Sequence, residues 1–98
     1  MARQFLIQPQ SELDIQAAAV WYEDQRPGLG GKFLDELDHV FHRIVENPRQ
    51  FPRLEETVHR ALLRHFPYGV YFVIGDERVD VLAVLHLHRH PEMWKSRN

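Results

Sequence analysis

The chain has 98 residues, of which 44% are apolar and 27% charged, and it contains no cysteine. This length suits one domain, residues 1–98, of ordinary globular composition. The lack of cysteine excludes a disulfide scaffold, a thiolate zinc site and a cysteine nucleophile. No apolar run approaches the about 20 residues of a membrane span, and the start of the chain lacks a signal-peptide core, so we expect a cytoplasmic protein with no membrane partner.

Charge is distributed unevenly along the chain. The net charge of −2 divides into −4 for residues 1–48 and +2 for residues 49–98, and the second half also holds five of the seven histidines. The isoelectric point of about 6.4 excludes a general nucleic-acid binder, for which a value above about 9 is expected. Any contact with a polyanion is therefore expected to be local and in the second half.

The first expected elements are a short strand and a helix. Residues 3–8 form an apolar run suited to a strand, and Pro9 ends that strand or begins the helix. Ser11 followed by Asp14 resembles a capping box and predicts the helix start. The residues 26–31, rich in glycine and proline, end the helix. Its apolar side is predicted to be Leu13, Ala17, Val20 and Trp21.

The second helix has the clearest pattern in the chain. Apolar residues recur there at steps of three and four, and polar residues fill much of the other side. Asn47-Pro48 is expected to stop the helix, because the residue before proline disfavours the helical conformation. Two helices joined by so short a loop predict an antiparallel hairpin. The apolar stripe is Phe33, Leu34, Leu37, Val40, Phe41, Ile44 and Val45.

After an irregular stretch the pattern changes to that of strands. Strands are predicted over residues 58–66, 70–74 and 79–88, separated by the short turns 67–69 and 75–78. Short connections favour an antiparallel arrangement. Helices followed by strands predict the α+β class, with a helical hairpin packed on a small antiparallel sheet.

Two arginines in the strand at 58–66 are candidate binding residues. Alternation places Arg60 and Arg64 on one face, roughly 7 Å apart along the strand. Guanidinium groups at that spacing suit adjacent phosphates. A solvated outer face of the sheet explains the same pattern, so both interpretations stay open at this point.

A histidine cluster follows in the last strand. His86, His88 and His90 alternate around Arg89, a pattern that could serve a metal, a proton transfer or a phosphate. No cysteine or paired carboxylate adjoins them, and Pro91 interrupts the strand, so we expect no metal site. A cationic, titratable cluster and a plain polar strand end remain as alternatives.

Other sequence features carry weaker signals. Trp94, beside Lys95 and Arg97, is explained by packing or by stacking on a base or in a partner's pocket. The glycines at 28–31 follow a helix and lack a Lys-Ser/Thr pair, so they do not form a phosphate-binding loop. No cofactor is expected.

Several short motifs in fixed order resemble a known family. They run from residue 5 to residue 97, and the block in the second half is the most specific. Together they make the chain similar to the RelE/ParE superfamily, the toxins of bacterial type II toxin–antitoxin modules, often called plasmid stabilisation proteins. The motifs are Ala19-Val20-Trp21-Tyr22-Glu23, Pro27-Gly28-Leu29-Gly30, Phe33, Asn47-Pro48, Phe51-Pro52, Arg60, Arg64, Phe66-Pro67-Tyr68, Tyr71, Val79 to Val84, His86, Arg89-His90-Pro91 and Trp94.

The resemblance implies a fold and a partner. The fold is a short first strand, a helical hairpin and then an antiparallel sheet. The partner is a small cognate antitoxin whose C-terminal segment wraps the toxin, in a toxin–antitoxin hetero-oligomer. We expect the antitoxin on exposed apolar parts of the hairpin and on the sheet edge.

The resemblance also implies two alternative targets. ParE-like members poison DNA gyrase, whereas RelE-like members cleave mRNA on the ribosome with basic residues and a C-terminal aromatic or histidine. Arg60 and Arg89 keep two basic positions of the RelE-like set, but Leu62 and Gly69 stand where others are expected, and Trp94-Lys95 replaces the tyrosine region. These departures and the low isoelectric point favour ParE-like action on gyrase.

If the chain is a nuclease, its catalytic candidates are Arg60, Arg89, His86 and His88. An inactive module that only binds its antitoxin is the third alternative. Binding is otherwise assigned to Arg64, Tyr68, Trp94, Lys95 and Arg97. The central prediction is that residues near 60, 64 and 86–94 converge on one cationic surface of the sheet.

Overall fold

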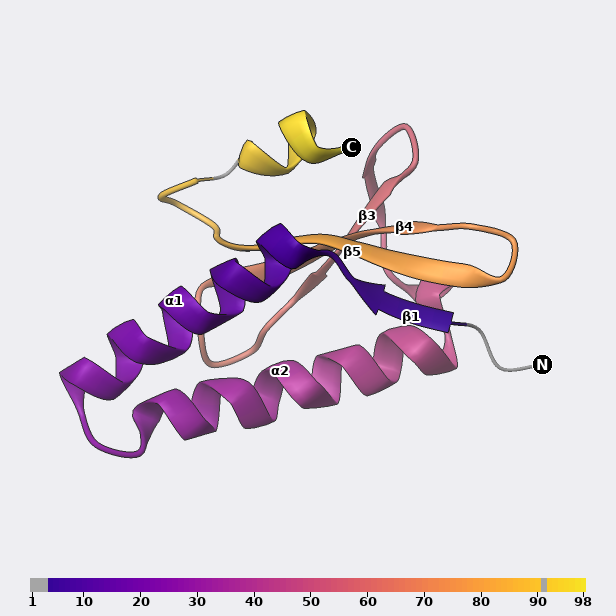
Figure 1. The fold of residues 1–98 in the computed structure, drawn as a ribbon. Coiled ribbons are helices and arrows are strands. Elements are labelled where there is room, and N and C mark those ends of the chain that lie inside the picture. The colour runs from indigo at the N-terminus through magenta and orange to yellow at the C-terminus, as the bar shows by residue number, and fades with distance from the viewer. Residues whose placement is uncertain (1–3, 91) are drawn as a thin grey trace.

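The computed structural model describes residues 4–90 and 92–98. Two helices lie side by side on one face of a sheet, and a short C-terminal 3-10 helix lies on the other face (Figure 1). The elements in chain order are β1 (Gln4–Ile7), α1 (Pro9–Gln25), α2 (Leu29–Glu46), η1 (Pro48–Gln50), β2 (Arg53–Glu55), β3 (Val58–Leu62), β4 (Tyr68–Ile74), β5 (Arg78–His86) and η2 (Met93–Arg97).

The α+β class with its N-terminal strand and helical hairpin is confirmed. The five strands form one sheet in the order β1-β5-β4-β3-β2. The strands from β2 to β5 are antiparallel to their neighbours, as expected, while β1 pairs with β5 in parallel, so the sheet is mixed. Two parallel strands need a long connection between them. The helical hairpin is part of the connection from β1 to β5.

Two predicted strands are shorter in the structure. The strand predicted at 58–66 ends at Leu62, because Glu36 of α2 accepts the backbone N–H groups of Arg64 and His65 and holds them in a turn. The strand predicted at 79–88 ends at His86. The stretch expected to be irregular contains the short strand β2, which extends the sheet beyond β3.

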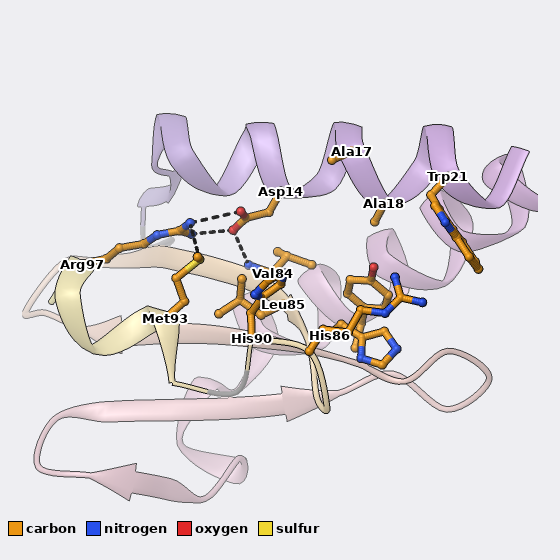
Figure 2. Close-up of a pocket in the computed structure, with 12 residues that line it drawn as sticks. Asp14, Ala17, Ala18, Trp21, Val84, Leu85, His86, His90, Met93 and Arg97 are labelled. Carbon is orange, nitrogen blue, oxygen red and sulfur yellow. Dashed lines mark hydrogen bonds and ion pairs between the residues drawn. The ribbon is translucent and has the colours of Figure 1, made fainter. Parts of the chain in front are cut away.

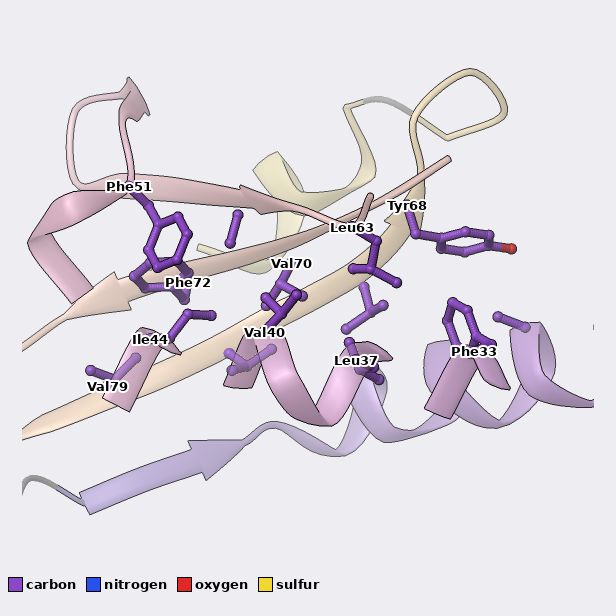
Figure 3. Packing of buried hydrophobic residues seen from close by; sticks show 14 of the residues in the cluster. Phe33, Leu37, Val40, Ile44, Phe51, Leu63, Tyr68, Val70, Phe72 and Val79 are labelled. Atoms are coloured by element: carbon purple, nitrogen blue, oxygen red, sulfur yellow. The ribbon is translucent and has the colours of Figure 1, made fainter. Parts of the chain in front are cut away.

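The main core lies between the helices and the sheet (Figure 3). The predicted α2 stripe supplies Phe33, Leu37, Val40 and Ile44, all buried. These side chains pack against the alternate residues of β3, β4 and β5 that point toward the helices. A second, smaller cluster covers the opposite face, which we call the outer face, and it is closed by Trp94 of η2.

The predicted apolar side of α1 is wrong. Leu13, Val20 and Trp21 are 63%, 55% and 42% exposed, while Ser11, Ala18 and Tyr22 face the core. Small residues let the helices approach so closely that a Cβ on Gly30 of α2 would lie 2.5 Å from the Ala19 carbonyl oxygen. The close approach selects the side of α1 that carries Ala18 and Ala19, and it leaves Leu13, Val20 and Trp21 outside.

The capping box predicted in α1 is also wrong. The helix begins earlier, with Gln8 as N-cap and Pro9 in its first turn. The Ser11 hydroxyl instead donates to the Val81 carbonyl oxygen at 2.9 Å, and the Asp14 carboxylate accepts from the Val84 amide at 3.0 Å. Both side chains therefore tie α1 to β5. Among the helices of the described residues, none has the length and apolar character needed to cross a membrane.

Candidate functional site

A pocket of about 470 Å³ lies between α1 and the end of β5 (Figure 2). The exposed side of α1 forms one wall, and the last residues of β5 and the segment that follows form the other. The pocket has a polar group at each end and an apolar middle. Its lining includes Asp14, Ala17, Trp21, Tyr68, His86 and Arg89.

An ion pair closes the first end of the pocket. The Arg97 guanidinium of η2 binds both carboxylate oxygens of Asp14, at 2.5 and 3.2 Å, and also donates to the Leu82 carbonyl oxygen. Both side chains of the pair are only 14% exposed. Because the Asp14 carboxylate also accepts the Val84 amide, it joins α1, β5 and η2 at one point.

An aromatic and basic group forms the second end. Tyr68 lies opposite His86 in the β4–β5 pairing, and their ring centres are 5.3 Å apart. The Arg89 guanidinium stacks over the Trp21 ring at 5.0 Å. This cation–π contact joins the segment after β5 to α1. The arginine is thus held over the pocket while the charge itself remains accessible.

Burial favours the neutral forms of His86 and Tyr68. The pKa of His86 is lowered by burial and by the nearby Arg89, with smaller effects of His88 and His90. The His86 Nδ1 atom accepts the backbone N–H of His88 at 3.1 Å, which leaves the proton of the neutral ring on Nε2. Burial raises the pKa of Tyr68, only partly offset by Arg89.

This arrangement has the groups needed to bind a partner. It offers one guanidinium, a phenol donor, an imidazole donor and an apolar wall, which suits a partner with an acidic or acceptor group beside an apolar one. Among the described residues, no group of three histidine, aspartate or glutamate side chains could hold a metal ion.

The predicted convergence on one surface is wrong. Arg60 pairs across the sheet with Tyr71 and packs over Gly69 on the outer face, away from the pocket. Arg64 lies beyond the end of β3 and lines a different hollow, beside α2. Of the predicted set, His86, Arg89, His90 and Met93 line the pocket, together with the binding candidates Tyr68 and Arg97.

The three C-terminal candidates are held in internal contacts. Trp94 is 5% exposed and stacks on Tyr71, with ring centres 5.7 Å apart and planes at 13°. Lys95 lies 3.4 Å from the Glu55 carboxylate and 3.0 Å from that of Glu92. Together with the Arg97 ion pair, these contacts fasten η2 to the outer face and to α1.

The side chains that α1 contributes to the pocket were not predicted from the sequence. Asp14 was assigned to a cap and Trp21 to packing, yet both line the pocket. The available signal was the pair Ala18 and Ala19, because small residues on the core side of a helix permit close packing there.

The fold is that of the small toxins related to RelE and ParE. The ParDE toxin–antitoxin system of Pseudomonas aeruginosa aligns with a TM-score of 0.77 at 15% identity, over 87% of this chain and 96% of that one. A free-state mutant of the Escherichia coli toxin RelE aligns with a TM-score of 0.68 at 16% identity, over 99% and 94%. At these identities the two structures establish the fold alone.

Sequence comparison defines the family. A family model described as the ParE toxin of type II toxin–antitoxin systems, parDE, matches residues 5–91. Toxin ParE2 of Mycobacterium tuberculosis, in each of two strains, is 30% identical over 92 residues, covering 93% of this chain and 88% of the relative. The chain belongs to the ParE toxin family. It is a toxin of the ParDE type, and the family implies a cognate antitoxin.

Proposed function

We propose that this toxin inhibits bacterial growth by binding DNA gyrase, without catalytic chemistry of its own. The observation that carries the proposal is the separation of the nuclease candidates: Arg60 is on the outer face, whereas His86 and Arg89 are at the pocket on the helix side. A general acid or base must lie within hydrogen-bond reach of the atom it serves, and the two sides of a sheet cannot share one phosphate. A gyrase poison needs no such set.

The rest of the outer face supports the same proposal. Beside Arg60, the positions that RelE-like nucleases fill with basic residues hold Leu62 and Gly69. The nearby cations Lys95 and Arg97 are already paired with carboxylates. DNA gyrase works in the cytoplasm, so the proposal places the toxin there.

We further infer that the cognate antitoxin neutralises the toxin by covering α1. The exposed side of α1, which we define as Leu13, Ala17, Val20 and Trp21, is an apolar stripe about 12 Å long at 1.5 Å per residue. It borders the pocket, where Arg89 offers a positive charge. A stripe of this kind on one side of a helix suits a second amphipathic helix with acidic flanks.

Capture of the antitoxin tests this assignment. The antitoxin encoded beside the toxin gene is coexpressed with tagged toxin carrying Val20→Glu or Trp21→Glu. Both residues are exposed, so the toxin is expected to fold but to lose at least about tenfold in antitoxin affinity, because a carboxylate replaces a buried apolar contact. Leu62→Glu, at an equally exposed leucine on the outer face, is the matched control and should bind normally. Equal capture by all three variants would refute the α1 assignment.

Growth and plasmid topology test the target in cells. Expression without antitoxin should arrest growth and relax plasmid DNA, and coexpression of the antitoxin should restore both. Normal growth with soluble folded toxin would instead support the inactive antitoxin-binding module.

The second candidate function is RelE-like cleavage of mRNA on the ribosome. One observation favours it: His86, with its proton on Nε2, lies beside Tyr68 and Arg89 at an accessible pocket. It predicts mRNA cleavage that falls about 10²–10⁴-fold in His86→Ala and Arg89→Ala, with His88→Ala and Arg60→Ala testing the other two assigned roles. Absence of cleavage by wild-type toxin on translating ribosomes would remove this candidate.

A further inference from the structure

A second groove lies on the opposite side of the helical hairpin, between α2 and the turn at 63–67. It consists of two adjoining hollows of about 410 and 400 Å³, which share Lys32, Glu36 and His65 in their linings. Its floor is apolar. The apolar lining is Val40, Leu29, Phe66, Pro67 and Tyr22. The groove is separate from the stripe on α1, and Arg64 is the one residue of its lining that the sequence marks as a binding candidate.

The groove is rimmed by unpaired positive charge. Lys32 of α2 and Arg64 of the turn both line it, and within the described residues neither side chain makes an ion pair. Arg43 lies at the far end, over the Phe51 ring at 5.2 Å. His39 and His65 add two imidazoles to the lining.

The nearest carboxylate is already occupied. One Glu36 oxygen accepts the backbone N–H groups of Arg64 and His65, at 2.5 and 2.9 Å, and the other lies 2.6 Å from the His65 ring. Glu36 therefore fixes the turn rather than neutralising Lys32. Asp35 is the other carboxylate in the lining, so fixed positive charge remains in excess.

We propose that this groove docks an acidic peptide segment of a partner protein, with carboxylates at Lys32 and Arg64 and an apolar side chain on the Val40 floor. Local carboxylates complement isolated cations, and the apolar floor gives a second, independent contact. A nucleic-acid strand fits less well. Its continuous phosphates would meet Asp35, Asp38 and Glu46 along α2.

Fluorescence polarisation with the full-length protein tests the proposal. The probe is a fluorescein-labelled peptide of about ten residues, rich in glutamate and carrying two leucines. Saturable binding is expected, at least about tenfold weaker in Lys32→Glu and in Arg64→Glu, because each reversal turns an attraction into a repulsion. Both side chains are exposed and unpaired, so the variants should keep the wild-type thermal unfolding curve.

The matched control is Arg53→Glu, the same charge change at an exposed position of β2 outside the groove. Its affinity should stay within about twofold of wild type. A peptide with serine in place of both leucines should bind more weakly, since it loses the floor contact. The proposal fails if no saturable binding occurs, if Arg53→Glu weakens binding as much as Arg64→Glu, or if a single-stranded oligothymidylate of equal length displaces the peptide. None of these outcomes requires the toxin to bind gyrase, so the test of the groove is independent of the proposed function.

Discussion

At the scale of single residues, Asp14 has the largest structural role outside the core. It accepts the Val84 amide N–H and binds both terminal nitrogens of the Arg97 guanidinium, so one side chain connects α1, β5 and η2. A sequence cannot reveal this role, because serine and aspartate near a helix start serve equally well as caps. Whether such a side chain caps its own helix or hydrogen-bonds to a neighbouring element depends on the strand that packs beside the helix.

Removing the Asp14 charge should destabilise the fold. Asp14→Asn leaves the largely buried Arg97 guanidinium without its counter-charge, at an expected cost of about 2 kcal/mol in the free energy of unfolding and a Tm lower by roughly 10 °C. Urea and thermal denaturation measure both quantities. Asp38→Asn is the control, because Asp38 and its partner His42 are about 70% exposed, and it should cost under about 0.5 kcal/mol. Equal effects of the two changes would contradict the role assigned to the ion pair.

Glu36 predicts a pH dependence of stability. Burial alone would raise the pKa of Glu36, but hydrogen bonds from the backbone and ring of His65 and from the Arg64 backbone outweigh it and lower the pKa below its ordinary value. The ionised form is thus favoured in the folded state. Its stabilising contribution is present above the ordinary glutamate pKa and is lost as the pH falls through the lower folded value.

Glu36→Gln should therefore be less stable than wild type near pH 7, by about 1–2 kcal/mol, because a neutral amide accepts the two N–H groups less strongly. The difference should shrink as the pH falls below about 4, where the wild-type carboxylate also becomes protonated. Denaturation curves from pH 7 to pH 3 measure it. A difference that stays constant over this range would contradict the assigned cause.

At the scale of elements, periodicity predicted that both helices exist but not which side of α1 is buried. In α2, the middle of the predicted stripe is buried, whereas Leu34 and Val45 at its margins are 43% and 41% exposed. In α1, the side that carries Ala18 and Ala19 is buried, because these small residues allow a close approach at Gly30. Which side of α1 gives the more favourable packing depends on α2, the helix that it contacts.

The two neighbouring glycines of α2 test this explanation. Gly30→Ala should destabilise the protein by about 1–3 kcal/mol, because its Cβ would collide with the Ala19 carbonyl oxygen and force the helices apart. Gly31→Ala has open space and should stabilise the helix by about 0.5–1 kcal/mol. Thermal denaturation of the pair gives the comparison. A stabilising Gly30→Ala would show that the hairpin tolerates a wider spacing.

At the scale of the whole molecule, the order of elements and the fold class were predictable, but the site was not. Alternation within a strand can be read from sequence, whereas the relative side of residues in different strands depends on register. Arg60 opposite Tyr71 faces outward, and His86 opposite Tyr68 faces the helices. The extra residue Leu82, a bulge in β5, shifts that register, and no sequence signal marks it.

For the whole molecule we propose a toxin that acts by occupying a target, because its cationic residues are distributed over separate surfaces. Purified toxin added in parallel to a gyrase supercoiling reaction and to a translation reaction is the most direct test. The account predicts that supercoiling is inhibited, with cleaved DNA accumulating, while mRNA on the ribosome stays intact. Full supercoiling at saturating toxin, or cleavage of the mRNA, would contradict it.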